Sequence, residues 1–308
     1  MLISTLFGIS EQYPIKIKFQ SWLSLADRAI QWGFVCIFAP PGFTFLTMKL
    51  ITTALLSLVS SLPISAKLVS QTVEYTDEKG TALQGYVAYD DGISGPRPGV
   101  LVIHDWRGLT DSTQMRADML AKLGYIAFAA DIYGKGVRPQ SLTEYGKQAT
   151  IYKSDRPLFR ARARAAYQAL LKQPLVDPGR IAAIGYCFGG TGVIEMARDG
   201  LDLKGVVSFH GGLDSRPLSP GATIKAKVLA LCGADDPFEK PEDMKAFEQQ
   251  LRDNSVDYQI VSYGHAVHAF TDPDVDKLNQ DGAKYNAPAD RRSWQAMHDF
   301  FAEIFAKK

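Results

Sequence analysis

Short strands that are apolar on both faces alternate with helical stretches through most of this chain of 308 residues. Residues 99–103 read Gly-Val-Leu-Val-Ile and residues 125–130 read Tyr-Ile-Ala-Phe-Ala-Ala, with a helical pattern between them. A strand without a polar face needs cover on both sides. Strands that alternate with helices form a mostly parallel sheet with helices on both faces. The alternation therefore predicts an α/β fold.

The alternation follows an amino-terminal hairpin and continues to the carboxyl terminus. The hairpin is predicted at residues 72–75 and 82–89, around a polar turn that contains Gly80. Further strands are predicted at residues 180–184, 205–209, 227–231 and 258–263, and helices at 111–123, 141–173 with a break near Pro157, 188–198, from Pro241 onward and over 294–305. We find no internal repeat or low-complexity linker after residue 67. Residues 67–308 are therefore expected to form one domain.

Three details of these helices can be tested against a structure. Asp111 is placed to cap the first helix, with Gln114 three residues later. The apolar stripe of that helix is predicted to consist of Met115, Met119, Leu120 and Leu123. A run of basic residues is interpreted as a solvated helix face: Arg160, Arg162 and Arg164.

The first 66 residues differ from the rest of the chain. A short basic start at Met48 and Lys49 precedes an apolar stretch over residues 51–62, and small residues end at Ala66. This order is typical of a secretory signal peptide and is too short for a spanning helix. We therefore expect residues 48–66 to be a signal peptide and residues 1–47 to be an over-extended or disordered segment. The mature protein is then secreted or periplasmic, with no stable insertion in a membrane.

An uncleaved anchor or a disordered leader is the alternative for this segment, with a membrane-anchored or cytoplasmic protein. The earlier apolar run is interrupted by Pro40 and Pro41, which makes it a poor membrane span. The amino terminus of the native protein would decide between these interpretations, because cleavage after Ala66 leaves Lys67 first.

The overall charge points to a small-molecule partner rather than a polyanion. Thirty-four basic and 33 acidic residues leave a formal net charge of +1, so no nucleic acid partner is expected. The three cysteines are too few for a disulfide framework in a chain of this length. We expect a monomer or a small homo-oligomer.

Cys187 lies in a strand–turn–helix pattern that is typical of a catalytic nucleophile. Residues 184–190 read Ile-Gly-Tyr-Cys-Phe-Gly-Gly, so a glycine stands two positions on either side of Cys187. The nucleophile elbow needs these glycines because its sharp turn leaves no room for side chains there. The positive end of the helix that begins at Phe188 favours a thiolate. A buried structural cysteine is the alternative.

A carboxylate and a histidine follow Cys187 in the order that the same fold uses. Asp236 comes after the strand at 227–231 and can orient an imidazole, with Asp235 as the competing carboxylate. His268 comes after the strand at 258–263, with His265 as the competing histidine. The order nucleophile, acid, histidine is that of an α/β-hydrolase. His265 and His268 also resemble a metal pair, but no third ligand stands at convincing spacing, so neither metal nor cofactor is expected.

The loop after residues 99–103 is expected to form part of an oxyanion hole. In this arrangement the backbone N–H of Trp106 and that of Phe188 are the two donors. Asp105 is expected close to the sulfur, where its charge would oppose thiolate formation. Cys232 ends a core strand and is interpreted as a packing residue. No Gly-x-Gly-x-x-Gly follows the first buried strand, so a dinucleotide site is not expected.

These motifs together resemble the dienelactone hydrolase family, from about residue 73 to the carboxyl terminus. The resemblance rests on residues 102–109, 130–134, 185–190, 233–237 and 268–270. It implies an α/β-hydrolase fold with a mostly parallel central sheet, a Cys187–Asp236–His268 triad, and no metal or organic cofactor. It also implies hydrolysis of a small ester or lactone through a thioester acyl-enzyme.

The sequence departs from the family pattern at three positions. Asp105 stands where the family archetype has a glutamate near the thiol. Lys135 and Asp272 stand where the archetype has two arginines that bind the carboxylate of its substrate. Because Asp272 would repel a carboxylate, we expect a neutral or differently shaped ester. A non-catalytic binding protein, an acyl transferase and a thiol peptidase are the alternative functions of the same fold.

Overall fold

The computed structural model describes residues 67–306. The predicted leader at 1–47 and signal peptide at 48–66 lie outside the described residues, so both stay predictions. Within residues 67–306, no helix combines the length and the apolar character that crossing a membrane requires.

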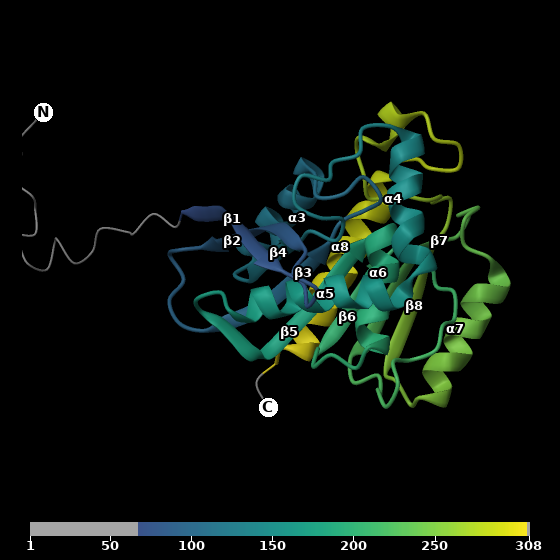
Figure 1. Ribbon diagram of the computed structural model, residues 1–308. Coiled ribbons are helices and arrows are strands. Elements are labelled where there is room, and N and C mark those ends of the chain that lie inside the picture. The colour runs from purple at the N-terminus through teal and green to yellow at the C-terminus, as the bar shows by residue number, and fades with distance from the viewer. Residues whose placement is uncertain (1–66, 307–308) are drawn as a thin grey trace, which may run out of the picture. The chain divides into compact units, whose positions relative to one another are not determined.

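An eight-stranded sheet forms the centre of the described residues (Figure 1). Its strands are β1 (Leu68–Thr76), β2 (Ala82–Asp90), β3 (Arg97–Ile103), β4 (Ile126–Ala130), β5 (Val176–Tyr186), β6 (Gly205–Phe209), β7 (Lys227–Gly233) and β8 (Tyr258–Tyr263). The spatial order is β1-β2-β4-β3-β5-β6-β7-β8. β2 pairs antiparallel with β1 and β4, and the neighbours from β4 to β8 pair in parallel. The predicted α/β fold with a mostly parallel sheet is confirmed.

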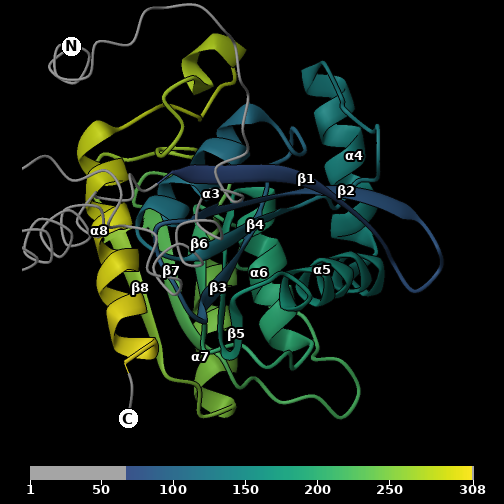
Figure 2. The same cartoon turned by 90° about the vertical axis from the view of Figure 1, so that its left-hand side faces the viewer.

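Helices cover both faces of this sheet (Figure 2). They are α3 (Asp111–Lys122), α4 (Leu142–Ser154), α5 (Arg156–Leu171), α6 (Phe188–Arg198), α7 (Pro241–Asp253) and α8 (Ala287–Ile304), with a 3-10 turn η2 (Val275–Leu278). One core contains side chains of α4 to α7, and the other contains side chains of α3 and α8. In β3, Leu101 and Ile103 belong to the first core, whereas Val100 and Val102 belong to the second. Both faces of β3 are therefore buried, as its sequence predicted.

Two predictions about α3 were wrong. Thr110, not Asp111, is the N-cap, and no side chain accepts a capping hydrogen bond there. Met115 and Leu123 are exposed, whereas Arg116 is buried with Leu120. The buried face of α3 therefore includes Arg116. This side chain can be buried because it donates a hydrogen bond to the Thr271 carbonyl at 2.5 Å. The break near Pro157 is confirmed, since α5 starts at Arg156 after its N-cap Asp155.

The predicted solvated face of α5 was also wrong. Arg160 and Arg162 are both only 7% exposed. Arg160 Nη2 lies 2.6 Å from a carboxylate oxygen of Glu195 on α6, and Arg162 Nη1 lies 3.0 Å from Asp77. A buried charge needs such a partner. Both acids come from other elements of the fold, so the local pattern of α5 did not reveal them.

The parallel arrangement places the chemistry-bearing loops together. β3, β5, β7 and β8 run in the same direction, so the loops that follow them emerge at one edge of the sheet. Ligands bind at this edge in open α/β sheets. The segments that contain Asp105, Cys187, Asp236 and His268 follow these four strands.

Candidate active site

Cys187 occupies a sharp turn between β5 and α6. Its φ is +52° and its ψ is −113°, a backbone conformation that non-glycine residues rarely adopt. A Cβ on Gly185 would lie 2.0 Å from the Gly189 carbonyl oxygen, and a Cβ on Gly189 would lie 2.2 Å from the Ile103 carbonyl oxygen. Both glycines are therefore required by close backbone contacts, as the elbow pattern predicted.

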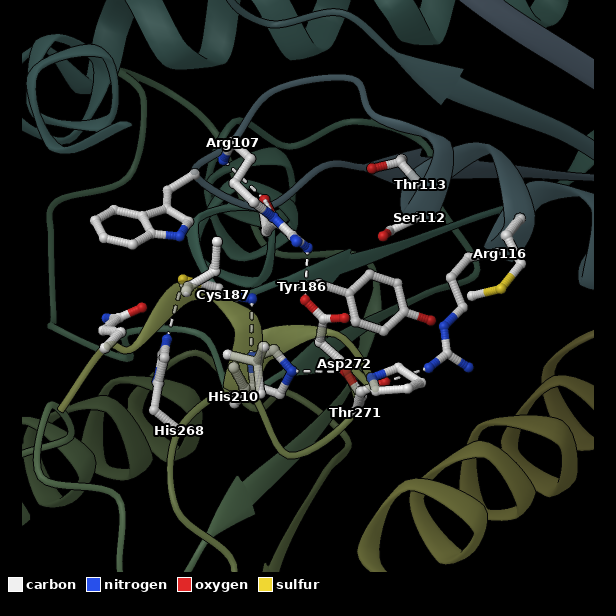
Figure 3. A pocket seen from close by; sticks show the side chains of 18 residues that line it. Arg107, Ser112, Thr113, Arg116, Tyr186, Cys187, His210, His268, Thr271 and Asp272 are labelled. Atoms are coloured by element: carbon white, nitrogen blue, oxygen red, sulfur yellow. Dashed lines mark hydrogen bonds and ion pairs between the residues drawn. The ribbon is translucent and has the colours of Figure 1, made fainter. Parts of the chain in front are cut away.

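A hydrogen-bonded chain connects Cys187, His268 and Asp236. His268 Nε2 lies 3.0 Å from Sγ of Cys187 (Figure 3). On the other side of the ring, His268 Nδ1 donates to Asp236 Oδ2 at 2.8 Å. The other oxygen of Asp236 accepts from the Phe238 N–H at 2.9 Å. The Asp236 side chain is 3% exposed and that of His268 is 11% exposed. The carboxylate is thus held in place and orients the imidazole toward the sulfur.

The competing residues lie elsewhere. The side chain of His265 is 99% exposed, and that of Asp235 is 60% exposed. Their closest approach is 4.0 Å, between His265 Nδ1 and Asp235 Oδ2. The structure therefore brings His268 and Asp236, rather than these neighbours, to Cys187. Within residues 67–306 no group of three or more His, Cys, Asp or Glu side chains could hold a metal ion.

The electrostatics favour a thiolate–imidazolium pair. Burial raises the pKa of the Cys187 thiol, but the charge and hydrogen bond of His268, helped by Lys153, outweigh burial and lower this pKa below its usual value. Burial lowers the pKa of His268, but the facing Cys187 sulfur and the Asp236 carboxylate raise it above its usual value. Each partner stabilises the charged form of the other.

His210 is a residue of the site that the sequence analysis missed. It follows β6, has a φ of +40°, and its Nδ1 accepts from the Cys187 N–H at 3.1 Å. Nε2 therefore carries the proton and donates to Thr271 Oγ1 at 2.8 Å. Burial and the charge of His268 hold the pKa of His210 well below its usual value. A neutral His210 therefore holds the backbone of the elbow through the hydrogen bond from the Cys187 N–H. In the sequence, only its position directly after a buried strand indicated that it belongs to the site.

The loop after β3 is held against the elbow. The buried His104 Nδ1 donates to the Asp105 carbonyl at 2.6 Å, and the Tyr133 hydroxyl donates to the Trp106 carbonyl at 2.9 Å. Trp106 lines the cavities beside Cys187, and Phe188 supplies the first N–H of α6. The first N–H groups of a helix have no intrahelical acceptor. The Phe188 N–H is therefore available as a donor beside Cys187, and the role of the Trp106 N–H stays a prediction.

Asp105 lies beside the site but is paired with Arg107. Arg107 Nη2 donates to Asp105 Oδ2 at 2.5 Å and to Asp272 Oδ2 at 2.6 Å, so one guanidinium joins the loops after β3 and β8. Asp272 is therefore not the unpaired repulsive charge that the sequence suggested. The charge of Asp105 still opposes thiolate formation, but it changes the pKa of Cys187 less than burial, His268 or Lys153 does. Lys135 pairs with Glu74 at 2.7 Å and does not line the cavities at Cys187.

Two cavities meet at Cys187 and His268. The first is narrow, with about 50 Å³ of free volume, and runs from Cys187 past Arg107 to α3 (Figure 3). The second has about 230 Å³ of free volume and is lined by Lys153, Phe238 and Glu239. Burial and the nearby Asp236 raise the pKa of Glu239 to about 7, although the Leu213 N–H opposes this.

The fold and the cysteine-centred elbow define an α/β-hydrolase. A sequence model of the dienelactone hydrolase family matches residues 83–305. The chain belongs to the dienelactone hydrolase family and is a hydrolase of carboxylic esters or lactones.

Similar proteins agree with this assignment. A dienelactone hydrolase-like promiscuous phosphotriesterase from metagenomic libraries is 41% identical, with a TM-score of 0.75 over 78% of this chain and 99% of that one. A Yersinia pestis protein named "Putative carboxymethylenebutenolidase" is 27% identical over 73% of this chain and 85% of its own length. Esterase 2 of Thermogutta terrifontis, 16% identical with a TM-score of 0.52 over 78% of this chain and 96% of its own, shares the fold.

Proposed function

We propose that this protein hydrolyses small uncharged esters or lactones through a thioester on Cys187. The observation that carries the proposal is the unbroken chain of contacts from Cys187 Sγ to His268 and on to Asp236, at 3.0 and 2.8 Å. A nucleophile in contact with a base that a carboxylate orients is the arrangement of nucleophilic catalysis.

In the first half-reaction the Cys187 thiolate attacks the carbonyl carbon, and the carbonyl π electrons move to oxygen. The N–H groups of Trp106 and Phe188 stabilise this oxyanion. Each such donor lowers the activation free energy by about 2.7–4 kcal/mol. When the tetrahedral intermediate collapses, the bond to the leaving oxygen breaks. The His268 imidazolium gives its proton to that oxygen, so an alcohol leaves, or the ring of a lactone opens.

In the second half-reaction neutral His268 accepts a proton from water while the water oxygen attacks the thioester carbonyl. Collapse of the second intermediate breaks the carbon–sulfur bond and releases a carboxylic acid. The thiolate and the imidazolium are then restored, with Asp236 stabilising the positive ring. One water is consumed for each ester cleaved, and no cofactor takes part.

The charges around the narrow cavity support an uncharged substrate. Arg107 already binds the carboxylates of both Asp105 and Asp272. Arg116 already binds Asp290 at 3.0 Å. A substrate carboxylate would therefore meet two neutralised cations and would have to displace a carboxylate of the protein, which costs free energy.

A phosphotriester is a second candidate substrate. The solved relative that is described as a promiscuous phosphotriesterase is 41% identical to this chain. Phosphotriesters are uncharged, so they suit the paired cations of the narrow cavity. Attack by the thiolate would displace the better leaving group from phosphorus, and water would then have to cleave the phosphorus–sulfur bond. We therefore expect turnover of a phosphotriester only if water reaches the phosphorus–sulfur bond.

Hydrolysis of p-nitrophenyl butyrate by wild type and Cys187→Ala tests the main proposal. We expect the wild type to give a burst of p-nitrophenol followed by steady turnover, and the trapped acyl-enzyme to carry its added mass on the peptide that contains Cys187. Cys187→Ala should lose both the burst and the turnover. Turnover that survives in Cys187→Ala would refute the thioester mechanism.

The alternative functions have their own outcomes in the same assay. A non-catalytic binding protein gives no burst and an ordinary thiol. An acyl transferase gives less acid and more new ester when an alcohol is added, because the acceptor replaces water. A thiol peptidase cleaves anilide substrates as well as esters. Secretion stays a prediction, which an amino terminus at Lys67 in the native protein would support.

A further inference from the structure

The inner end of the narrow cavity contains a hydroxyl group that the hydrolytic mechanism does not use. Tyr186 is 7% exposed and lines this cavity next to Cys187. Its hydroxyl oxygen is buried and has no hydrogen-bond partner among the described residues. Buried hydroxyl groups in folded proteins almost always have such a partner. The missing partner is what a bound molecule could supply.

The ring of Tyr186 is held firmly, so its hydroxyl has a defined direction. Phe209 stacks on the ring at 4.7 Å, and the Arg116 guanidinium lies over it at 5.4 Å. Burial raises the pKa of this phenol, so the group stays protonated and acts as a hydrogen-bond donor. Figure 3 shows the hydroxyl directed away from Cys187, toward Arg116.

The rest of this end is polar but has no spare charge. Ser112 and Thr113, in the first turn of α3, line the same cavity as Tyr186. Arg116 is committed to Asp290 and to the Thr271 carbonyl. Hydroxyl donors without a free cation favour an uncharged oxygen acceptor over a carboxylate.

We propose that the end of the narrow cavity at Tyr186 binds an uncharged acceptor oxygen on the acyl part of the substrate. The substrate class is then an ester or lactone whose acyl part carries a second oxygen, as an ether, a carbonyl or a hydroxyl group. For convenience this region, formed by Tyr186, Ser112 and Thr113, is called the oxygen subsite. The inference rests on the proposed function.

The acyl part is assigned to this cavity because it stays on the enzyme through both half-reactions. A narrow cavity holds a group in place better than a wide one. The cavity at Tyr186 has about 50 Å³ of free volume, whereas the second cavity has about 230 Å³. The wider cavity, beside Phe238 and Lys153, leaves room for the alcohol to depart and for water to enter.

The test compares p-nitrophenyl hexanoate with analogues in which one acyl methylene, at position 3, 4 or 5, is replaced by oxygen. The quantity measured is the ratio of kcat/KM for each oxa analogue to that for hexanoate. We expect one oxa position to be preferred by the wild type, and Tyr186→Phe to lower that ratio on the order of 3- to 10-fold, the value of one hydrogen bond. Intrinsic differences in ester reactivity cancel when the two enzymes are compared.

Ser112→Ala is the second variant, since Ser112 is a partly exposed residue whose truncation leaves the core intact. It should lower the same ratio by a smaller factor. Tyr125→Phe is the matched control, because its hydroxyl lies outside both cavities at Cys187, and it should leave the ratio unchanged. The thermal midpoint of Tyr186→Phe should equal or exceed that of the wild type, since the unpartnered hydroxyl is gone.

The oxygen subsite is refuted if Tyr186→Phe and Ser112→Ala both keep the wild-type ratio at every oxa position. The proposed function fails in a different way, with no wild-type turnover of hexanoate or with turnover that survives in Cys187→Ala. The two failures are therefore distinguishable in one set of assays.

Discussion

The ends of β5 and β7 each present a thiol in a buried setting, yet the pKa values of the two thiols shift in opposite directions. Cys187 follows β5, and its pKa is lowered although burial acts to raise it. Cys232 lies in β7, and burial, with Glu239 and Asp236 nearby, raises its pKa to about 12. Burial is common to both, so the sign of the neighbouring charge decides the outcome.

Asp236 affects the two thiols in opposite ways. It acts directly on Cys232, where a negative charge disfavours a thiolate. It acts on Cys187 through His268, because the hydrogen bond from Nδ1 stabilises the imidazolium that faces the sulfur. One carboxylate therefore adds to the effect of burial on the pKa of Cys232 and, through His268, offsets the effect of burial on the pKa of Cys187.

The largest expected effect separates the two thiols by activity. Cys187→Ala should lower kcat for an activated ester on the order of 10⁴-fold or more, as the loss of a nucleophile does. Cys232→Ala should keep the wild-type kcat and lower only the thermal midpoint, because it leaves a small cavity in the core. Steady-state kinetics and thermal melts of both variants measure this. A comparable loss of kcat in both variants would show that the two thiols do not differ in their role in the reaction.

Alkylation of wild type and His268→Asn tests the source of the contrast. At about pH 7, iodoacetamide should label Cys187 and leave Cys232 unlabelled, because only the thiolate reacts. In His268→Asn only the weaker influence of Lys153 still opposes burial, so the pKa of Cys187 should rise and labelling at this pH should fall at least about tenfold.

The sign of the pH dependence follows from the direction of the shift. The Cys187 thiolate is lost as the pH falls through its lowered pKa, so wild-type labelling should persist below the usual range of thiol titration and then decline. In His268→Asn the decline should move to higher pH. Mass spectrometry of the labelled peptides resolves the two cysteines. Identical profiles for the two proteins would show that His268 does not activate the sulfur.

Local rules made the elbow predictable from the sequence. The glycines at 185 and 189 are needed because backbone atoms approach within 2.2 Å of where a Cβ would stand. This requirement appears in the sequence as a short local motif around Cys187. Strands β3, β4 and β6 were predictable for the same reason, since each is a short run buried on both faces. The meeting of Cys187, Asp236 and His268 at one edge of the sheet then followed from the parallel strands.

Long-range pairing made the remaining features unpredictable. Arg107 and Asp272 are 165 positions apart, and neither shows in the sequence that it pairs with the other. The burial of Arg160 depends on Glu195, which lies on another helix. His210 stands alone after β6, and a single histidine without a motif does not distinguish support of the elbow from ordinary packing.

Arg107 gives the smallest expected effect and tests the residual charge that opposes the thiolate. In Arg107→Gln the Asp105 carboxylate loses its partner, so its negative charge acts more fully on the sulfur. The pKa of Cys187 should rise, and labelling at about pH 6 should fall by about two- to fivefold, the size expected of one charge in a partly hydrated site. Adding Asp105→Asn to Arg107→Gln should restore the wild-type rate, because the freed charge is then removed. If the double variant labels as slowly as Arg107→Gln, the effect comes from loss of the bridge to Asp272 rather than from charge, and Asp105 has no part in setting the reactivity of Cys187.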